Sequence, residues 1–148
     1  MIETLLAYAR LLEFNILTLE KYNEYLNDIF LENPDNDLLL DLQWCSSDIK
    51  TSIGTILTYS EMVEINYDLF GKMLFSELKL FYFKNQMDIQ TFALKVRSIW
   101  WLLPNSIGQK EPFHAMSYLD EPLSWGDEKQ TRELYEKMFE FYEINDTN

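Results

Sequence analysis

Few side chains in this sequence have the type and spacing that chemistry requires. The chain contains one histidine, His114, and one cysteine, Cys45. A histidine-based metal site needs further ligands at fixed spacing, and neither a CxxC nor an HExxH motif is present. Cys45 falls on the apolar face of a helical pattern, so we interpret it as a small core residue. The sequence therefore predicts no catalytic residue, no metal site and no cofactor, and we expect a protein that is not an enzyme.

Acidic side chains form two groups that are candidates for binding. The segment from Glu20 to Asp48 contains eight acidic residues and one basic residue, Lys21. The second group lies in a proline-flanked loop beside Tyr118 and Trp125, and acids around an aromatic side chain are typical of a binding hot spot for basic groups. The candidate binding residues are Glu20, Glu24, Asp28, Asp35, Asp37, Asp41, Asp120, Glu121, Trp125, Asp127 and Glu128.

Each acidic group also has a purely structural interpretation. Glu20, Glu24 and Asp28 recur every four residues and form one stripe, which can be a solvated helix face. The loop acids can instead cap a helix, and Trp125 can pack in the core. Sequence alone leaves both interpretations open for both groups.

The overall charge narrows the classes of partner. The formal net charge is −13, from 25 acidic against 12 basic residues. Such a protein repels nucleic acid and anionic membranes and attracts basic proteins, although excess acid can also serve solubility alone. The first residues lack the basic leader of a signal peptide, and no apolar run is long enough for a membrane span. We therefore expect a cytoplasmic protein that binds neither membrane nor nucleic acid.

The elements that must position these residues are helices. Apolar residues recur with helical spacing from Leu69 to Tyr82, and again at Ile89, Phe92, Val96, Ile99, Trp100 and Leu103. These two segments predict an antiparallel hairpin linked through residues 84–86, with Asp88 capping its second helix. Low glycine and proline content argues against a β fold. We predict an all-α antiparallel bundle of about five or six helices in a single domain, residues 1–148.

Helix boundaries are predicted by turn and capping residues. Helical patterns cover residues 2–14 and, after a cap at Thr18, continue to about residue 31. Pro34 stops this helix, and Asp35 or Asp37 is expected to cap the next one. That next helix is expected either to bend in its middle, around Gly54, or to break near Ser46-Ser47-Asp48. Prolines and glycines interrupt residues 104–126, and Asp127 is expected to cap the final helix.

The second half of the chain resembles a known group of proteins. The segment FYFKNQMDIQTFALKVRSIWW, followed by SYLDEPLSWGDEKQTRELYEKMF, resembles colicin D immunity-type proteins and the contact-dependent growth inhibition immunity class, over about residues 70–143. These are small acidic helical proteins encoded beside bacterial toxins. The resemblance implies binding to a cognate toxin, often a nuclease, whose basic cleft is covered by acidic side chains. By position, Asp120, Glu121, Asp127 and Glu128 lie in the resembling loop.

Three functions follow as hypotheses. The first is an immunity protein, or antitoxin, that neutralises a cognate toxin with a basic surface through electrostatic steering and steric blocking. The second is a helical adaptor or regulatory subunit that binds another protein through an apolar groove. The third is a small-ligand pocket lined by Trp100, Trp101, Tyr118 and Trp125. The oligomeric state is left open.

Overall fold

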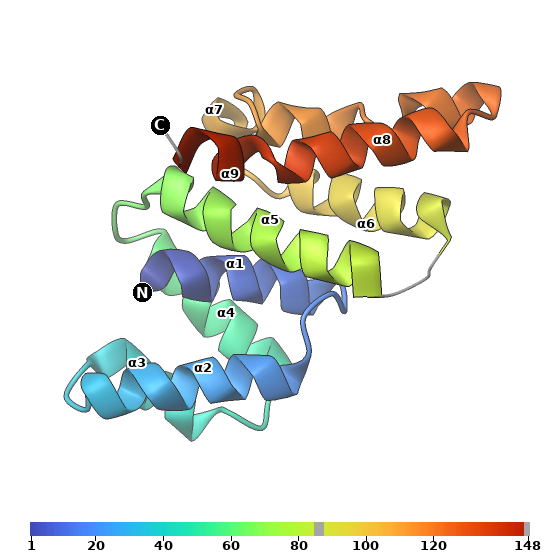
Figure 1. The fold of residues 1–148 in the computed structure, drawn as a ribbon. Helices are drawn as coiled ribbons and strands as arrows, with labels where there is room; N and C mark the ends of the chain where they lie inside the picture. The colour runs from blue at the N-terminus through green and yellow to red at the C-terminus, as the bar shows by residue number, and fades with distance from the viewer. Residues whose placement is uncertain (85–87, 147–148) are drawn as a thin grey trace. The chain divides into compact units, whose positions relative to one another are not determined.

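The fold class predicted from the periodicity is confirmed. A computed structural model describes residues 1–84 and 88–146, and within these ranges the chain is helical with no strand (Figure 1). Its contacts divide it into two compact units, Met1–Leu74 and Phe75–Asn148. The expected single domain stays a prediction.

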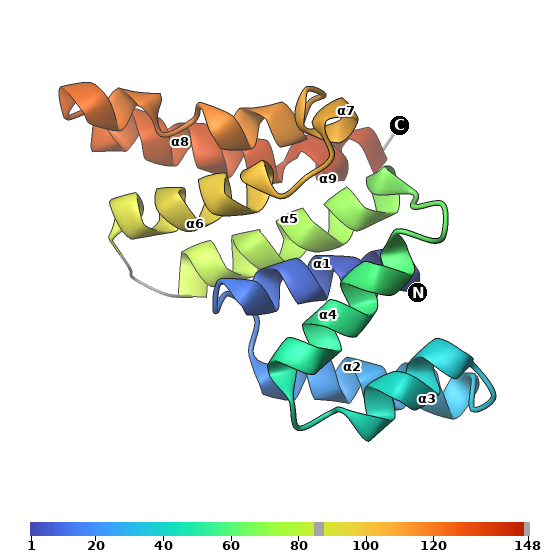
Figure 2. The same cartoon turned by 180° about the vertical axis from the view of Figure 1, so that it is seen from behind.

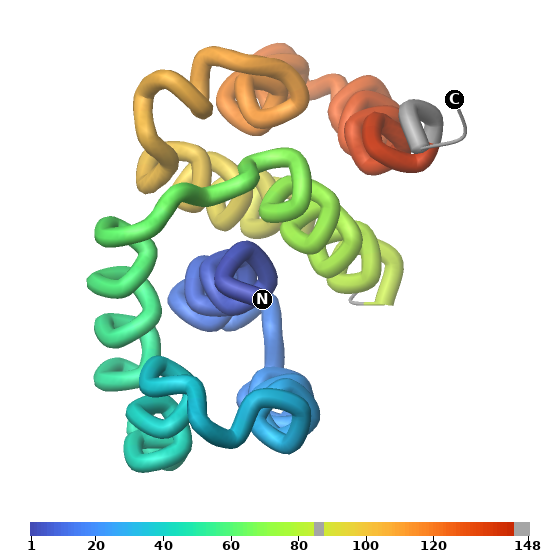
Figure 3. Tube along the Cα trace, turned by 90° about the vertical axis from the view of Figure 1, so that its left-hand side faces the viewer, coloured from blue at the N-terminus to red at the C-terminus, as the bar shows by residue number. Residues whose placement is uncertain are grey.

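The first unit consists of four helices and the beginning of a fifth. Its elements are α1 (Ile2–Glu13), α2 (Leu19–Glu32), α3 (Asp37–Trp44), α4 (Ile49–Ser60) and the first residues of α5 (Tyr67–Lys84). Helix α4 packs against α1, and α2 and α3 form a hairpin whose second helix also contacts α4 (Figures 2 and 3). One fully buried side chain from each of α1 to α4 illustrates this core: Leu11, Tyr22, Leu39 and Ile56.

Side-chain caps fix where the helices of this unit begin. The Thr18 hydroxyl accepts a hydrogen bond from the Lys21 amide at 3.2 Å, as predicted. The expected break near Ser46–Asp48 is also present, and the Asp48 carboxylate caps α4 through the Thr51 amide at 3.2 Å. The prediction for α3 was wrong. Its cap is Asn36, which accepts from the Leu39 amide at 3.1 Å, so Asp37 is the first helical residue.

The second unit surrounds an aromatic core. Its elements are the rest of α5, α6 (Ile89–Trp101), α7 (Asn105–Gly108), the 3-10 segments η1 (Phe113–Ser117) and η2 (Glu121–Trp125), α8 (Glu128–Phe139) and α9 (Phe141–Asp146). Helix α6 contacts η1, and α8 contacts η2. Tyr82 on α5, Phe92 on α6 and Phe139 on α8 meet with ring-centroid distances of 5.2–6.4 Å. These contacts hold the three long helices together.

The predicted central hairpin corresponds to α5 and α6. The Tyr82–Phe92 contact joins them, and Figure 1 shows α6 running back along the second half of α5. Two residues of its expected link, Asn85 and Gln86, lie outside the described residues. Asp88 does precede α6, but its carboxylate makes no hydrogen bond to the first turn, so the predicted side-chain cap was wrong.

The described residues form nine α-helices and two 3-10 segments. The expected number was about five or six helices, so the chain is divided into more elements than predicted. Asn15, with φ of 58°, separates α1 from α2, which is a conformation that asparagine tolerates. Glu140 separates α8 from α9 near the end of the chain. None of the described helices is long and apolar enough to cross a lipid bilayer.

Two glycines give a stability prediction with opposite signs. Gly126 ends η2 with φ of +79°, whereas Gly54 is an exposed residue inside α4, and a Cβ atom at either position meets nothing within 4 Å. We expect Gly126→Ala to lower the free energy of unfolding by about 1–2 kcal/mol, because an L side chain strains the left-handed conformation. Gly54→Ala should raise it by about 0.5–1 kcal/mol, because alanine favours helix. Urea unfolding of both variants measures the pair.

Each glycine variant serves as the control for the other, since both add one methyl group in open space. Equal effects on stability in the two variants would contradict the assigned backbone conformations.

Candidate functional site

Acidic charge is concentrated in the first unit. Residues 1–74 contain 13 acidic and 4 basic residues, a net charge of −9, whereas residues 75–148 contain 12 and 8, a net charge of −4. The six candidate carboxylates of this unit are all exposed: Glu20, Glu24, Asp28, Asp35, Asp37 and Asp41. No basic side chain in the described ranges forms an ion pair with any of them. Their negative potential is therefore not cancelled locally.

Three of these acids form a stripe along α2. Glu20, Glu24 and Asp28 lie on the face opposite the buried Tyr22 and Leu26. This placement agrees with the predicted spacing. It fits a solvated helix face as well as a binding surface.

A second pair of acids lies on α3 beside exposed apolar side chains. Asp37 and Asp41 are four residues apart, as are Leu40 and Trp44, so the four side chains share the outward face of this helix. The Trp44 side chain is 88% exposed. Sequence reasoning missed Trp44 and Leu40, although their spacing from the two aspartates is the signal that could have identified them. Asp35, in the turn before α3, is exposed as well.

Asp37 and Asp41 also line an open groove between α3 and α4. The groove has a volume of about 500 Å³. Its residues on α4 are small or hydroxylated, with Tyr59 near the end of that helix and Met62 just beyond it. The groove therefore combines two carboxylates with partly apolar walls.

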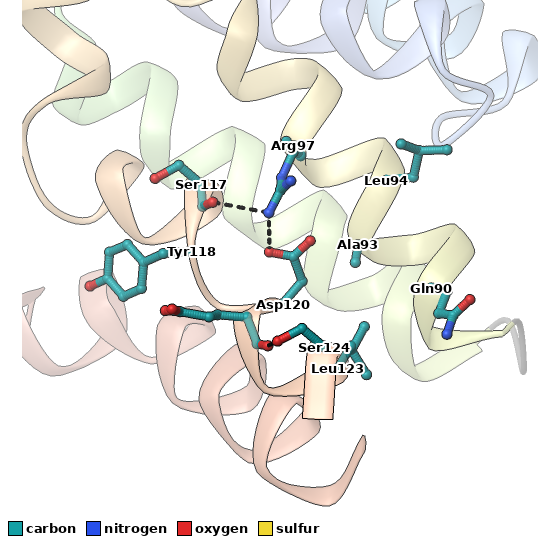
Figure 4. Close-up of a pocket in the computed structure, with 10 residues that line it drawn as sticks. Gln90, Ala93, Leu94, Arg97, Ser117, Tyr118, Asp120, Leu123 and Ser124 are labelled. Carbon is teal, nitrogen blue, oxygen red and sulfur yellow. Dashed lines mark hydrogen bonds and ion pairs between the residues drawn. The ribbon is translucent and has the colours of Figure 1, made fainter. Parts of the chain in front are cut away.

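The loop acids of the second unit are mostly engaged within the protein. The Asp120 carboxylate accepts a hydrogen bond of 2.6 Å from the Arg97 guanidinium on α6, which also donates to the Ser117 carbonyl at 3.3 Å (Figure 4). The Asp127 carboxylate caps α8 by accepting from the Gln130 amide at 3.0 Å, as predicted. The Glu128 carboxylate pairs with Arg132 at 2.8 Å.

Two loop residues keep their side chains available. The Glu121 carboxylate is exposed and has no ion-pair partner in the part of the chain that the structure describes. Trp125 is exposed, so the alternative placement of this side chain in the core is wrong. The loop therefore offers one unpaired carboxylate and one aromatic side chain.

An open pocket of about 840 Å³ lies between α6 and this loop. Tyr118 contributes to it, together with Arg97, Asp120, Glu121 and residues of α6 and η2 (Figure 4). Among the described residues that line it, none is a tryptophan. Trp100 instead donates a hydrogen bond from its indole nitrogen to the Gly108 carbonyl at 2.9 Å, which ties α6 to α7. This pocket therefore differs from the tryptophan-lined ligand pocket of the third hypothesis, which stays a prediction.

The remaining reactive side chains form small polar contacts. His114 Nδ1 lies 3.5 Å from the Glu111 carboxylate, which also accepts from the Tyr118 hydroxyl at 3.1 Å. The partly exposed Cys45 thiol lies 3.5 Å from the Ser52 hydroxyl. Burial and the contact with Glu111 raise the pKa of Tyr118. Within residues 1–84 and 88–146, no three His, Cys, Asp or Glu side chains are placed to hold a metal ion.

The residues that sequence predicted as binding candidates thus fall into two classes. Asp120 and Asp127 make contacts within the second unit, and the exposed Glu128 pairs with Arg132 on the same helix. Glu121, Trp125 and the acids of α2 and α3 are exposed and have no such contact among the described residues. Comparison of the chain with models of known families, with curated proteins and with solved structures finds no match in any of the three.

Proposed function

We propose that this protein is a non-enzymatic immunity protein that binds a basic protein toxin and blocks its active site. The observation that carries the proposal is the set of exposed, unpaired carboxylates on α2 and α3 in a unit of net charge −9. A cleft built to bind the phosphates of a nucleic acid also accepts carboxylates, because both are anionic oxygen ligands for arginine and lysine. A nuclease toxin is the partner that the sequence resemblance implies.

The proposed mechanism has an electrostatic and a steric part. The acidic surface attracts a basic partner over a distance set by ionic strength and thereby raises the association rate. The bulk of the helical units then excludes nucleic acid from the cleft of the toxin. Binding in the bacterial cytoplasm, where such a toxin would act, belongs to this proposal.

The proposal expects a gene beside the one for this chain to encode a protein with a toxic C-terminal segment, and the test uses that segment. Coexpression of the chain should restore growth of cells that produce the segment. The association rate constant should fall by about 10-fold or more when salt rises from about 0.01 M to about 1 M, a range that shortens the Debye length from ~30 Å to ~3 Å. Stopped-flow mixing measures the rate.

A charge-reversed variant, Glu20→Lys with Glu24→Lys and Asp28→Lys, provides the matched comparison. It should associate more slowly and lose most of its salt dependence, because the attraction is removed while the buried face of α2 is kept. Absence of growth protection by the wild type would overturn the proposal. Protection with an association rate indifferent to salt would instead overturn the electrostatic part of the mechanism.

A further inference from the structure

The groove between α3 and α4 has features that a plain solvated surface lacks. Its volume of about 500 Å³ exceeds the space that one amino-acid side chain fills, and it opens to solvent. Asp37 and Asp41 stand on one wall, and Thr51, Thr55 and Thr58 stand on the other. Both walls belong to the first unit, and Figure 2 shows the two helices.

The charge of this groove lacks a counterion from the protein. Its lining contains two carboxylates and, among the residues described, no basic side chain. Hydrogen bonds from Thr51 lower the pKa of the Asp48 carboxyl, and Lys50 lowers it further by a smaller amount. Lys50 is the basic residue of α4, and it lies beside Asp48. Asn36 caps α3, so neither groove aspartate serves as its side-chain cap. Both aspartates are therefore available to an incoming cation.

Apolar side chains flank the two carboxylates on both sides. Leu40 and the highly exposed Trp44 lie next to them on α3, and Met62, which is 71% exposed, lies at the far wall of the groove. A large aromatic side chain beside a charged recess is the arrangement found where a few residues dominate a protein interface. Tryptophan in particular pairs a large apolar area with attraction for cations.

Gly54 leaves space above the backbone of α4 within this groove. A Cβ atom at this position meets nothing within 4 Å. Glycine inside an exposed helix lowers stability relative to alanine, so helix stability does not explain this residue. The feature that distinguishes the position is the open space left by the missing side chain. A long side chain entering from outside can thus approach the helix closely.

We propose that this groove, given the function proposed above, receives an arginine side chain from the surface of the basic partner, with Trp44 packing against the same segment. Charge complementarity with two carboxylates requires a cationic occupant. A guanidinium group fits this requirement, because its several N–H groups can donate to both carboxylates. The aliphatic part of the arginine side chain lies along the threonine and methionine side chains, while its neighbours in the partner contact Trp44.

The first test uses N-acetyl-arginine amide as the probe and N-acetyl-citrulline amide as its neutral isostere. In amide NMR spectra, the arginine probe should shift the signals of Asp37, Asp41, Gly54 and Thr58 in a saturable way, with a dissociation constant on the order of millimolar. The citrulline probe should leave them in place. Equal shifts with both probes, or shifts spread over all exposed acids, would overturn the proposal.

Two variants separate shape from charge. Gly54→Met fills the groove with a residue that favours helix, and Asp37→Asn with Asp41→Asn removes the charge while keeping the shape. Both should abolish the arginine response. The matched control, Glu20→Gln with Glu24→Gln, removes the same amount of charge from the stripe on α2. This variant should keep the arginine response. Gly54→Ala should keep the arginine response as well. A full response in Gly54→Met would contradict the groove as the binding site.

The second test returns to the toxin segment. Gly54→Met, and separately Trp44→Ala, should raise the dissociation constant of the complex by about 30-fold, the loss expected at an interface hot spot. The Gly54→Ala variant should bind within about 3-fold of the wild type. If the wild type fails to neutralise any toxin while the arginine probe binds, the proposed function fails alone. If neutralisation is unaffected by Gly54→Met, the groove proposal fails alone.

Discussion

Replacement of Phe92 by alanine should lower the free energy of unfolding by about 3–5 kcal/mol, because a large cavity opens in a core that cannot fully collapse. The Phe92 side chain is 1% exposed. Its ring centroid lies 5.1 Å from that of Tyr135, 5.2 Å from Tyr82 and 6.4 Å from both Phe81 and Phe139. These contacts add to the loss of buried area, since edge-to-face aromatic pairs contribute about 0.5–1.5 kcal/mol each.

Urea unfolding followed by circular dichroism measures the Phe92 effect. Leu94→Ala on the same helix is the control, because its side chain is 67% exposed. That variant should stay within about 0.5 kcal/mol of the wild type. Comparable losses in the two variants would contradict the placement of Phe92 at the centre of the aromatic core. Proteins of this size have a total stability of about 5–15 kcal/mol, so the Phe92 substitution should remove a large fraction of it.

The ion pair between Arg97 and Asp120 carries the second large prediction. Arg97→Met should lower the free energy of unfolding by about 1.5–3 kcal/mol. The Asp120 carboxylate, whose side chain is 17% exposed, would lose its charged hydrogen bond of 2.6 Å and remain largely out of water. The Ser117 carbonyl would lose a donor as well. Thermal and urea unfolding both measure the change.

A double-mutant cycle with Asp120→Asn separates the pair from its surroundings. We expect a coupling energy of about 0.5–3 kcal/mol. Lys129→Met, which removes an exposed pair with Glu133 at 3.9 Å, is the control and should change stability by less than about 0.5 kcal/mol. Additive losses in the cycle would show that Asp120 does not depend on Arg97. In that case Asp120 would return to the set of carboxylates available to a partner.

Local patterns predicted most of the helices because their causes lie within a few residues. Six residues were assigned to one face from spacing alone: Ile89, Phe92, Val96, Ile99, Trp100 and Leu103. Five of them are buried, and Trp100 is half-buried. The caps at Thr18 and Asp127 depend on a side chain and an amide three residues later, so sequence contains all the information. At α3, three potential caps compete within residues 35–37, and spacing does not rank them.

The site was harder to predict because it depends on contacts between distant residues. Asp120 was expected to face a partner, yet 23 residues separate it from Arg97, and no local pattern announces that pair. Trp44 was not among the predicted binding residues, because the prediction followed the acidic side chains and the loop beside Tyr118 and Trp125. The groove beside it exists only after α3 and α4 pack together.

The unequal distribution of charge between the two units couples folding to binding. Repulsion among the carboxylates of residues 1–74, at a net charge of −9, opposes the compact state of that unit more than it opposes the second, at −4. A polycation that binds the folded surface relieves this repulsion. By thermodynamic linkage, its binding stabilises the folded state of the unit. A partner of the proposed kind would therefore act on the first unit as a ligand that raises its melting temperature.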